Sequence, residues 1–404
     1  MPEHGLAEAV ALAAALPELA VVGSEVVRLA RVQPATLIGS GKVEELKARF
    51  KADHIELVLV DGTVSPVQQR NLEKEWGVKL LDRTSLILEI FADRARTREG
   101  VLQVELAHLT YQKSRLVRSW THLERQRGGF GFLGGPGETQ IEADRRVIEE
   151  RIARIEAELE KVKKRRKLHR ESRARVPYPI AALVGYTNAG KSTLFNRLTG
   201  AEVMAEDLLF ATLDPTMRAI GLPGVEKAIL SDTVGFISDL PTQLVAAFRA
   251  TLEEVIAADI VCHVRDMANE AAGPQKAQVL AILEELGVVS GEGGGGVPIL
   301  EVWNKWDALT PERRAELEPL SETDDVVALS ALTGEGVDAL AIRLGELLTE
   351  GARLHEMVIP AGDGRRLAWL HQHGEVVDER DAGDSERLVR VRLSAKELGQ
   401  FESL

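Results

Sequence analysis

Gly185-Tyr-Thr-Asn-Ala-Gly-Lys-Ser192 is the most informative stretch of this 404-residue chain. It fits the pattern G-x-x-x-x-G-K-[ST], in which glycines let backbone N–H groups close around phosphate oxygens. The apolar run Ile180 to Val184 precedes it, and the amphipathic stretch Ser192 to Leu198 follows it. A strand, a loop and a helix in this order predict a phosphate-binding loop, and a nucleoside triphosphate is the expected ligand.

Two side chains of this loop have expected chemical roles. Lys191 should neutralise the β and γ phosphates, and the Ser192 hydroxyl should ligate Mg²⁺. The residues expected to contact the nucleotide here are Gly185, Tyr186, Thr187, Asn188, Ala189, Gly190, Lys191, Ser192 and Thr193.

A second motif, Asn304-Lys305-Trp-Asp307, closes the apolar run Val297 to Val302 and indicates which base is bound. The Asp307 carboxylate can accept hydrogen bonds from N1–H and the 2-amino group of guanine, whereas adenine offers no matching pair of donors. A buried polar edge without a partner is penalised, so one carboxylate can set the specificity. Guanine is therefore favoured over adenine.

Two further motifs follow strand-like runs in the order that this reading requires. Asp232-Thr-Val-Gly235 offers a carboxylate that can hold Mg²⁺ through water, and the Gly235 N–H can meet a γ-phosphate. Ser330-Ala331-Leu332 follows another apolar run and can contact guanine through a main-chain amide. Together the motifs predict a GTP-binding site at the carboxyl edge of a doubly wound, mostly parallel sheet.

The pattern of segments predicts four parts. Residues 1–95 should form a small α/β domain, 96–176 a basic helical hairpin, 177–351 the phosphate-loop domain, and 352–404 a small C-terminal α/β domain. The first part alternates helical and strand-like segments, which predicts a parallel sheet. These segments are Leu6–Leu16, Glu25–Leu37, Val43–Phe50, Ile55–Asp61, Pro66–Trp76 and Val78–Asp82.

Gly39-Ser-Gly-Lys42, within the first part, lacks the spacing of a phosphate loop. We interpret it as a turn before a helix. An anion site, and with it a weak second nucleotide site in this part, stays open as an alternative.

Composition limits the cellular setting. The single cysteine, Cys262, excludes a disulfide framework, and its apolar surroundings predict a buried core residue. No apolar stretch approaches the roughly 20 residues of a membrane span, and the N-terminus lacks a basic signal region. We expect a cytoplasmic protein without a membrane span, and a monomer by default.

The charge is distributed unevenly. The net charge is -13, yet the stretch from Arg94 to Arg175 holds 21 basic against 12 acidic residues, a local excess of nine positive charges. A basic arm on an acidic body is typical of proteins that meet polyphosphate. Apolar residues at steps of three and four predict two packed helices in this arm. The seam positions are Leu102, Leu106, Leu109, Lys113, Leu116, Trp120 and Leu123 on one helix, and Ile148, Ile152, Ile155, Leu159 and Val162 on the other.

The glycine-rich stretch from Gly128 to Gly137 separates the two helices and contains aromatic residues that we expect to be exposed. A flexible connector is the simpler interpretation, but a connector rarely carries aromatic residues flanked by charge. We expect a tip that inserts into RNA or protein, with rings that stack on bases and arginines that contact phosphates. The residues expected to make these contacts are Arg125, Arg127, Phe130, Phe132, Arg145 and Arg146.

Five stretches resemble those of the HflX family of translational GTPases. They are Gly185-Tyr-Thr-Asn-Ala-Gly-Lys-Ser192, Phe210-Ala-Thr-Leu-Asp-Pro215, Asp232-Thr-Val-Gly-Phe236, Asn304-Lys-Trp-Asp307 and Gly134-Gly-Pro-Gly-Glu-Thr-Gln140. The likeness covers nearly the whole chain, because stretches near residues 39–45 and 367–371 also resemble that family's outer domains. The resemblance implies a GTPase that binds the large ribosomal subunit and its rRNA and splits or rescues stalled or idle ribosomes.

The resemblance also implies roles for individual residues. It places Phe210 near the nucleotide and makes Thr212 a ligand of Mg²⁺, so that Lys191, Thr212 and Gly235 are the expected catalytic groups and Ser192, Thr212 and Asp232 the expected metal site. Relatives with an asparagine at the position of Asn188 can hold K⁺, which makes K⁺ a second candidate cofactor. Phe236 stands where many regulatory GTPases carry a glutamine that orients water, so hydrolysis should be slow without a partner.

Two other functions are compatible with parts of the sequence. The first is a passive RNA-binding scaffold that ignores nucleotide because its site is degenerate; the complete set of phosphate and metal groups disfavours it. The second is an ATP-driven remodeller, which the Asn304 to Asp307 motif disfavours.

Overall fold

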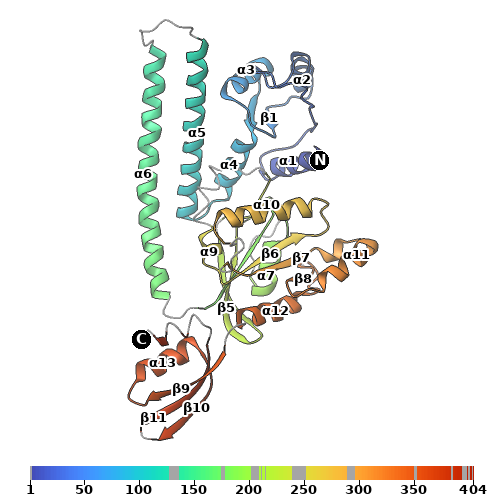
Figure 1. Ribbon diagram of the computed structural model, residues 1–404. Helices are drawn as coiled ribbons and strands as arrows, with labels where there is room; N and C mark the ends of the chain where they lie inside the picture. Colours follow the sequence, from blue (N-terminus) through green and yellow to red (C-terminus); the bar gives the residue numbers. More distant parts are fainter. Residues whose placement is uncertain are drawn as a thin grey trace.

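The computed structural model describes residues 2–126, 136–173, 178–201, 209–210, 212–213, 215–238, 252–288, 296–349, 353–383, 385–393, 398, 401–402 and 404. Figure 1 shows a central sheet with helices on its faces, an N-terminal α/β part beside a long helical hairpin, and a small C-terminal sheet. Among the described residues, no helix is both long enough and apolar enough to cross a membrane.

The central sheet has six strands in the order β4-β5-β3-β6-β7-β8. All neighbours are parallel except β4 and β5, which confirms the doubly wound, mostly parallel sheet. The strands are β3 (Ile180–Gly185), β4 (Thr216–Leu222), β5 (Val225–Asp232), β6 (Ile260–Asp266), β7 (Ile299–Asn304) and β8 (Val326–Ala328). The helices beside them are α7 (Lys191–Thr199), α9 (Glu253–Ile256), α10 (Ala272–Glu285), η1 (Trp306–Ala308), α11 (Pro311–Ser321) and α12 (Val337–Thr349).

Both faces of this sheet are buried, as alternation along β3 shows. Ala181 and Leu183 pack in one core with residues of α7 and α12, whereas Ala182 and Val184 pack in another core with residues of α10. Successive side chains of a strand point to opposite faces, so a strand covered on both sides reads as a continuous apolar run. Cys262 on β6 is fully buried, as expected from the sequence.

The N-terminal part contains the predicted parallel sheet, formed by β1 and β2. Its elements are α1 (Pro2–Ala14), α2 (Ser40–Ala52), β1 (Leu57–Val60), α3 (Pro66–Trp76), β2 (Lys79–Asp82) and α4 (Arg83–Arg94). The segment expected over Glu25–Leu37 is described throughout and has no helix or strand, only an isolated bridge between Gln33 and Leu37. Its side chains at Val26 and Val32 are exposed, whereas Val27 and Leu37 pack against the core of the N-terminal part without forming a regular element.

The hairpin consists of α5 (Arg98–Gln126) and α6 (Pro136–Arg173). Leu102, Leu109, Ile155 and Leu159 form its core, which confirms the predicted seam over this length. Ion pairs across the seam join Lys113 to Glu149 at 3.0 Å and Arg98 to Glu158 at 3.2 Å. The side chains of Trp120 and Leu123, and the glycine-rich tip over 127–135, lie outside the described residues.

The C-terminal part is a three-stranded antiparallel sheet in the order β10-β11-β9, with one helix packed on it. The elements are β9 (Arg353–Pro360), α13 (Gly364–His373), β10 (Glu375–Gly383) and β11 (Glu386–Leu393). Leu370 of α13 packs with Val389 and Val391 of β11 in a small core of its own.

One hydrophobic core joins the N-terminal part to the central part. It contains Leu12 near the end of α1 and Phe91 of α4 as well as Phe236 and α10 residues of the central part. The boundaries drawn at residues 95, 176 and 351 stay predictions.

Candidate nucleotide-binding site

The loop between β3 and α7 has the backbone that a phosphate cradle needs. Gly190 has φ 91°, and a Cβ there would lie 2.2 Å from the Asn304 Nδ2 atom, so only glycine fits. Asn188 has φ 60°, a conformation that asparagine tolerates better than most residues, and it is exposed. The loop therefore presents its backbone amides at the N-terminus of α7, where an anion is favoured.

Lys191 lies beneath this loop with a residue exposure of 6%. Its Nζ atom donates to the carbonyl oxygens of Gly185 at 3.2 Å and Tyr186 at 2.9 Å. Burial lowers the Lys191 pKa to about 8, and the negative charge of Asp232 opposes that shift. A polyphosphate would supply the strong counter-charge that the buried ammonium lacks.

Three oxygen-bearing side chains from separate segments meet beside Lys191. Asp232 Oδ2 accepts from Ser192 Oγ at 2.7 Å and from Thr212 Oγ1 at 3.0 Å, and the two hydroxyls are 2.9 Å apart. The other Asp232 oxygen, Oδ1, is buried and has no hydrogen-bond partner among the described residues. Burial raises the Asp232 pKa, which the Lys191 charge opposes.

This set of donors fits Mg²⁺, because hydroxyl and carboxylate oxygens are the ligands that this ion prefers. An unpartnered buried carboxylate oxygen is also costly unless a cation or water meets it. Ser192, Thr212 and Asp232 are therefore arranged as a set that could hold the ion.

The segment after β5 packs directly against the phosphate loop. Thr187 N donates to Phe236 O at 2.6 Å, and Phe236 N donates to Gly185 O at 3.1 Å. A Cβ on Gly235 would lie 2.9 Å from the Thr187 Cα atom and 3.0 Å from Lys191 Nζ. Glycine therefore lets the main chain at this position approach the phosphate loop closely. The Phe236 ring is buried in the core shared with the N-terminal part, so packing is one role of this residue.

The base-binding end is held together by Asn304. Its Nδ2 atom donates to Ala189 O at 2.7 Å, and its Oδ1 atom accepts from Ala331 N at 2.9 Å. Both ends of this amide are thus occupied by protein, so Asn304 joins the phosphate loop to the loop after β8. Ser330 is buried beside it, whereas Leu332 is 71% exposed.

Lys305 and Asp307 flank the same end and are more accessible. Lys305 has φ 62°, and its Nζ atom lies 2.8 Å from Asp266 Oδ2 at the end of β6. Asp307 lies in the short helix η1 and is exposed, so its carboxylate is accessible to a base. Thr193, the remaining residue of the loop motif, is half-buried in the first turn of α7.

Two of the expected nucleotide residues turn their side chains toward the N-terminal part. The Tyr186 hydroxyl donates to Glu8 Oε2 of α1 at 2.7 Å. The Phe210 ring, at φ 58°, meets the Phe91 ring of α4 edge-on, with centroids 4.6 Å apart. Because both side chains face the N-terminal part, Tyr186 and Phe210 can contact a nucleotide through their main chain alone.

Sequence reasoning missed the N-terminal residues that border the site, namely Glu8, Arg83 and Phe91. Arg83 donates to the Ser238 carbonyl at 2.9 Å and its hydroxyl at 3.0 Å, just beyond Gly235 and Phe236. No local pattern marks these residues, because they are separated from their partners by more than a hundred positions.

The Gly39-Ser-Gly-Lys42 turn does begin α2, but Lys42 is paired with Glu25 at 3.1 Å and Glu45 at 2.6 Å.

Only two of the expected RNA-contact residues have described side chains. Arg145 pairs with Glu149 at 3.0 Å and Arg146 with Glu150 at 3.8 Å, and both arginines are exposed on α6. Arg125, Arg127, Phe130 and Phe132 lie outside the residues whose side chains are described.

Four family matches cover most of the chain. They are GTP-binding GTPase N-terminal over residues 3–92, GTP-binding GTPase Middle Region over 94–173, 50S ribosome-binding GTPase over 180–305, and HflX C-terminal domain over 316–403. A protein of Magnetococcus marinus named GTPase HflX is 51% identical over 384 residues, which cover 95% of this chain and 87% of that protein. The chain belongs to the HflX family of GTPases.

Other HflX relatives agree over the same length. GTPase HflX of Escherichia coli is 45% identical over 365 residues, covering 89% of this chain and 83% of that protein. Among solved structures, a GTP-binding protein from Sulfolobus solfataricus in complex with GDP is 26% identical and covers 87% of this chain and 97% of that one, with a TM-score of 0.45. The expected family and a GTP-hydrolysing enzyme are thereby confirmed.

Proposed function

We propose that this HflX-family GTPase is a translation factor that binds the large ribosomal subunit and splits or rescues stalled or idle ribosomes, with its nucleotide state controlling the association. The observation that carries the proposal is the meeting of Ser192, Thr212 and Asp232 beside Lys191. A site that served only to stabilise the fold would have no reason to keep every phosphate and metal group. A family match described as a 50S ribosome-binding GTPase supports the partner.

In this proposal each group of the site has one task. Lys191 neutralises the β and γ phosphates, Ser192 and Thr212 would ligate Mg²⁺, and Asp232 would hold a water bound to that ion. When bound, Mg²⁺ supplies positive charge that neutralises the phosphates. The Gly235 N–H meets the γ-phosphate, and its fixed position against Thr187 favours that contact.

Base recognition is divided between direct contacts and support. Asp307 accepts from guanine N1–H and the 2-amino group, and the Lys305 stem covers the ring. Main-chain amides of Ser330 to Leu332 contact the guanine oxygen. Asn304 acts through Ala189 and Ala331, to which its amide is bonded, by holding the two loops together.

Hydrolysis by the isolated protein should be slow. The Phe236 ring is buried in the core and cannot hydrogen-bond an attacking water. The missing group must then come from the partner or from rearrangement of the loops when the protein docks.

Asn188 supports a role for K⁺ in the same step. Its left-handed backbone and exposure leave its side chain free to face the bridging phosphate oxygens. A cation held there would offset charge that develops during phosphoryl transfer, as an arginine finger does.

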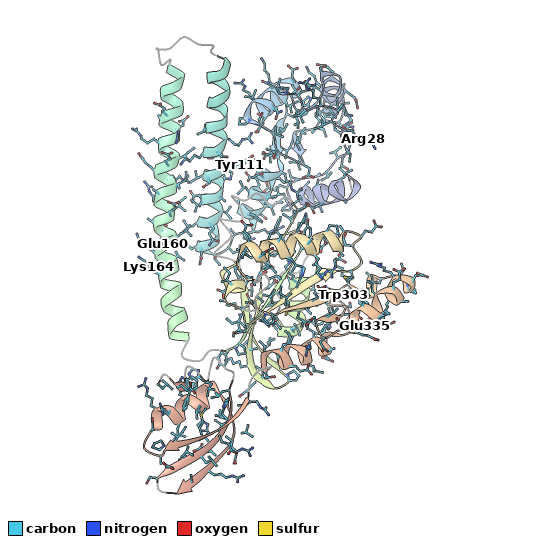
Figure 2. The ribbon with its side chains drawn as sticks, in the orientation of Figure 1. Arg28, Tyr111, Glu160, Lys164, Trp303 and Glu335 are labelled. Carbon is cyan, nitrogen blue, oxygen red and sulfur yellow. The ribbon has the colours of Figure 1, made fainter. Side chains whose placement is uncertain are left out.

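The hairpin is the proposed ribosome-contacting element. Its basic stretch can contact rRNA phosphates, and its glycine-rich tip carries Phe130 and Phe132, which can stack on bases. Glu160 and Lys164 mark the described face of α6 that Figure 2 shows directed away from the rest of the protein. In this proposal the GTPase works in the cytoplasm, because its partner is the ribosome. It acts as a monomer.

Co-sedimentation with purified large subunits tests the proposal. The wild-type protein with a non-hydrolysable GTP analogue should pellet with subunits, and an Arg145→Glu, Arg146→Glu double variant should pellet at least several-fold less. Arg313→Glu on α11 is the matched control, because this exposed arginine also pairs with a glutamate one turn away. Equal retention of both variants would exclude the hairpin contact.

Light scattering of intact ribosomes tests the finer activity. Protein with GTP should lower the scattering as subunits separate, and protein with GDP should not. Retention that ignores nucleotide, with no change in scattering, would instead favour the passive RNA-binding scaffold.

A further inference from the structure

Helix α4 of the N-terminal part contacts both loops that respond to the γ-phosphate. At its first residue, the Arg83 guanidinium donates to the carbonyl and hydroxyl oxygens of Ser238 at 2.9 and 3.0 Å. Near its last turn, the Phe91 ring packs against Phe210, two residues before Thr212. A shift of either loop must therefore displace α4 or break these contacts.

The Arg83 end is a cluster of charged side chains in which Arg83 is buried, Glu8 is partly buried and Asp61 is exposed. Arg83 is 8% exposed and also contacts Asp61 and Glu8, and Glu8 in turn accepts from the Ser238 and Tyr186 hydroxyls. A buried ion pair that loses one partner is strongly destabilised, because the remaining charge is neither paired nor hydrated. In one arrangement of this cluster Arg83 keeps all its partners; in the other the contacts break and water reaches the charged groups. The cluster therefore has two discrete arrangements.

The residue before Arg83 faces the hairpin. Asp82 is buried at the end of β2 and caps α4 by accepting from Ser85 N at 2.9 Å. It also pairs with Arg115 of α5 at 3.1 Å and accepts from the Tyr111 hydroxyl. Figure 2 shows Tyr111 on α5, on the side that borders the N-terminal part.

The Asp82 contacts form a rigid connection to α5. The Arg115 Nη1 atom donates to the Tyr111 hydroxyl at 2.7 Å and to Val64 O at 3.0 Å in addition to Asp82. Burial, followed by the hydrogen bond to Asp82, raises the Tyr111 pKa to about 12, so its hydroxyl stays a donor at neutral pH. Charge-assisted bonds of this kind hold geometry better than neutral ones.

Two adjacent residues thus face in two directions: Arg83 to the loop after Gly235, and Asp82 to the base of the hairpin. We propose that the Asp82–Arg83 junction transmits the position of the γ-phosphate loop to the helical hairpin. The N-terminal part then moves with the hairpin as one body, and the nucleotide sets the position of that body relative to the central sheet.

This inference rests on the proposed nucleotide control of the hairpin, and it can be tested without ribosomes. Spin labels are placed at Arg154→Cys on α6 and Glu312→Cys on α11, both exposed positions. The native Cys262 is fully buried, and burial raises its pKa to about 12, so it does not compete for the label. Pulsed distance measurements are made on the full chain with GDP and with a non-hydrolysable GTP analogue.

The unsubstituted protein should show different distance distributions in the two nucleotides. Arg83→Ala should bind both nucleotides and give one distribution in both. Arg94→Ala is the matched control, because Arg94 is a buried arginine of the same helix whose carbonyl partner, Ala15 O at 2.9 Å, belongs to the N-terminal part. It should keep the nucleotide-dependent change.

Tyr111→Phe tests the other side of the junction with little risk to folding. It removes the hydroxyl that reaches Asp82 and leaves the nucleotide site untouched, so GTP affinity and turnover should be unchanged while the distance change shrinks. A full distance change in both Arg83→Ala and Tyr111→Phe would overturn the proposal, as would identical distributions in the two nucleotides for the unsubstituted protein. Failure here with normal co-sedimentation would leave the ribosome proposal standing.

Discussion

The side-chain amide nitrogen of Asn304 donates to the carbonyl oxygen of Ala189 over 2.7 Å and so joins the base-binding loop to the phosphate loop. Asn304 is 2% exposed, and its oxygen also accepts from Ala331 N. Asn304→Ala leaves two buried backbone groups unpaired, at about 1–3 kcal/mol each. Urea denaturation should therefore show a loss of about 2–6 kcal/mol in the free energy of unfolding. Asn304→Asp keeps the acceptor and should lose less; equal stability of Asn304→Ala and the wild type would contradict the bridging role.

Lys191→Ala should abolish GTP binding and hydrolysis. The ammonium is proposed to make charge-assisted contacts with two phosphates, and losing about 3 kcal/mol lowers affinity on the order of 100-fold. Fluorescent nucleotide titration measures the effect. Lys74→Ala, which removes an exposed lysine from α3, is the charge-matched control and should bind normally. Normal affinity in Lys191→Ala would refute the site.

Asp307→Asn should exchange one base for another. The substitution replaces one of two carboxylate acceptors by an NH2 donor. That donor suits the 2-oxo group of xanthine but opposes the 2-amino donor of guanine, so GTP should bind more weakly and xanthosine triphosphate more tightly. A discrimination change of about 2–3 kcal/mol is expected for a matched polar edge. Because Asp307 is exposed, stability should be unchanged. Competition binding with GTP and xanthosine triphosphate measures the base preference. An unaltered preference would contradict the role of Asp307 in recognising guanine.

Nucleotide affinity should fall as the pH rises above about 8. The Lys191 pKa is about 8 because of burial, against 10.5 ordinarily, and phosphate charge must raise it again on binding. Below pH 8 the lysine is charged both before and after the nucleotide binds. Above pH 8 the free lysine is largely neutral, so it must take up a proton when the nucleotide binds. Calorimetry at pH 9 in two buffers of different ionisation enthalpy should detect that uptake. Lys191→Arg should lack it, and constant affinity from pH 7 to 9.5 in the wild type would contradict the prediction.

Turnover should depend on the monovalent cation. If Asn188 helps to hold K⁺, hydrolysis in KCl should exceed that in NaCl at equal ionic strength, and Asn188→Ala should remove the difference. Release of phosphate under single-turnover conditions measures this. Identical wild-type rates in both salts would end the idea.

Much of the central fold could be predicted because its signals are local. Gly185 to Ser192 combines the end of a buried strand, glycines and a helix start within a few residues, and the burial of β3 on both faces follows from its apolar run. The helical seam was equally readable, since Leu102 and Ile155 repeat with their neighbours at steps of three and four. Such patterns depend only on which residues are close to each other within one helix or strand.

The contacts across the chain could not be predicted in this way. Tyr186 and Phe210 lie within nucleotide motifs, yet their side chains meet Glu8 and Phe91, which are far away in the sequence. The segment around Val26 looked like a regular element by its composition, but Val26 and Val32 are exposed and the segment forms no helix or strand. In each case the deciding partner is set by tertiary packing, which a local pattern does not record.

The affinity for purified large ribosomal subunits, measured with GDP and with a non-hydrolysable GTP analogue, tests the central claim most directly. Nucleotide control predicts a dissociation constant at least about tenfold lower with the analogue, which corresponds to about 1.4 kcal/mol of coupling. Lys191→Ala should bind equally under both conditions. Equal dissociation constants for the wild-type protein in the two nucleotides would contradict the account.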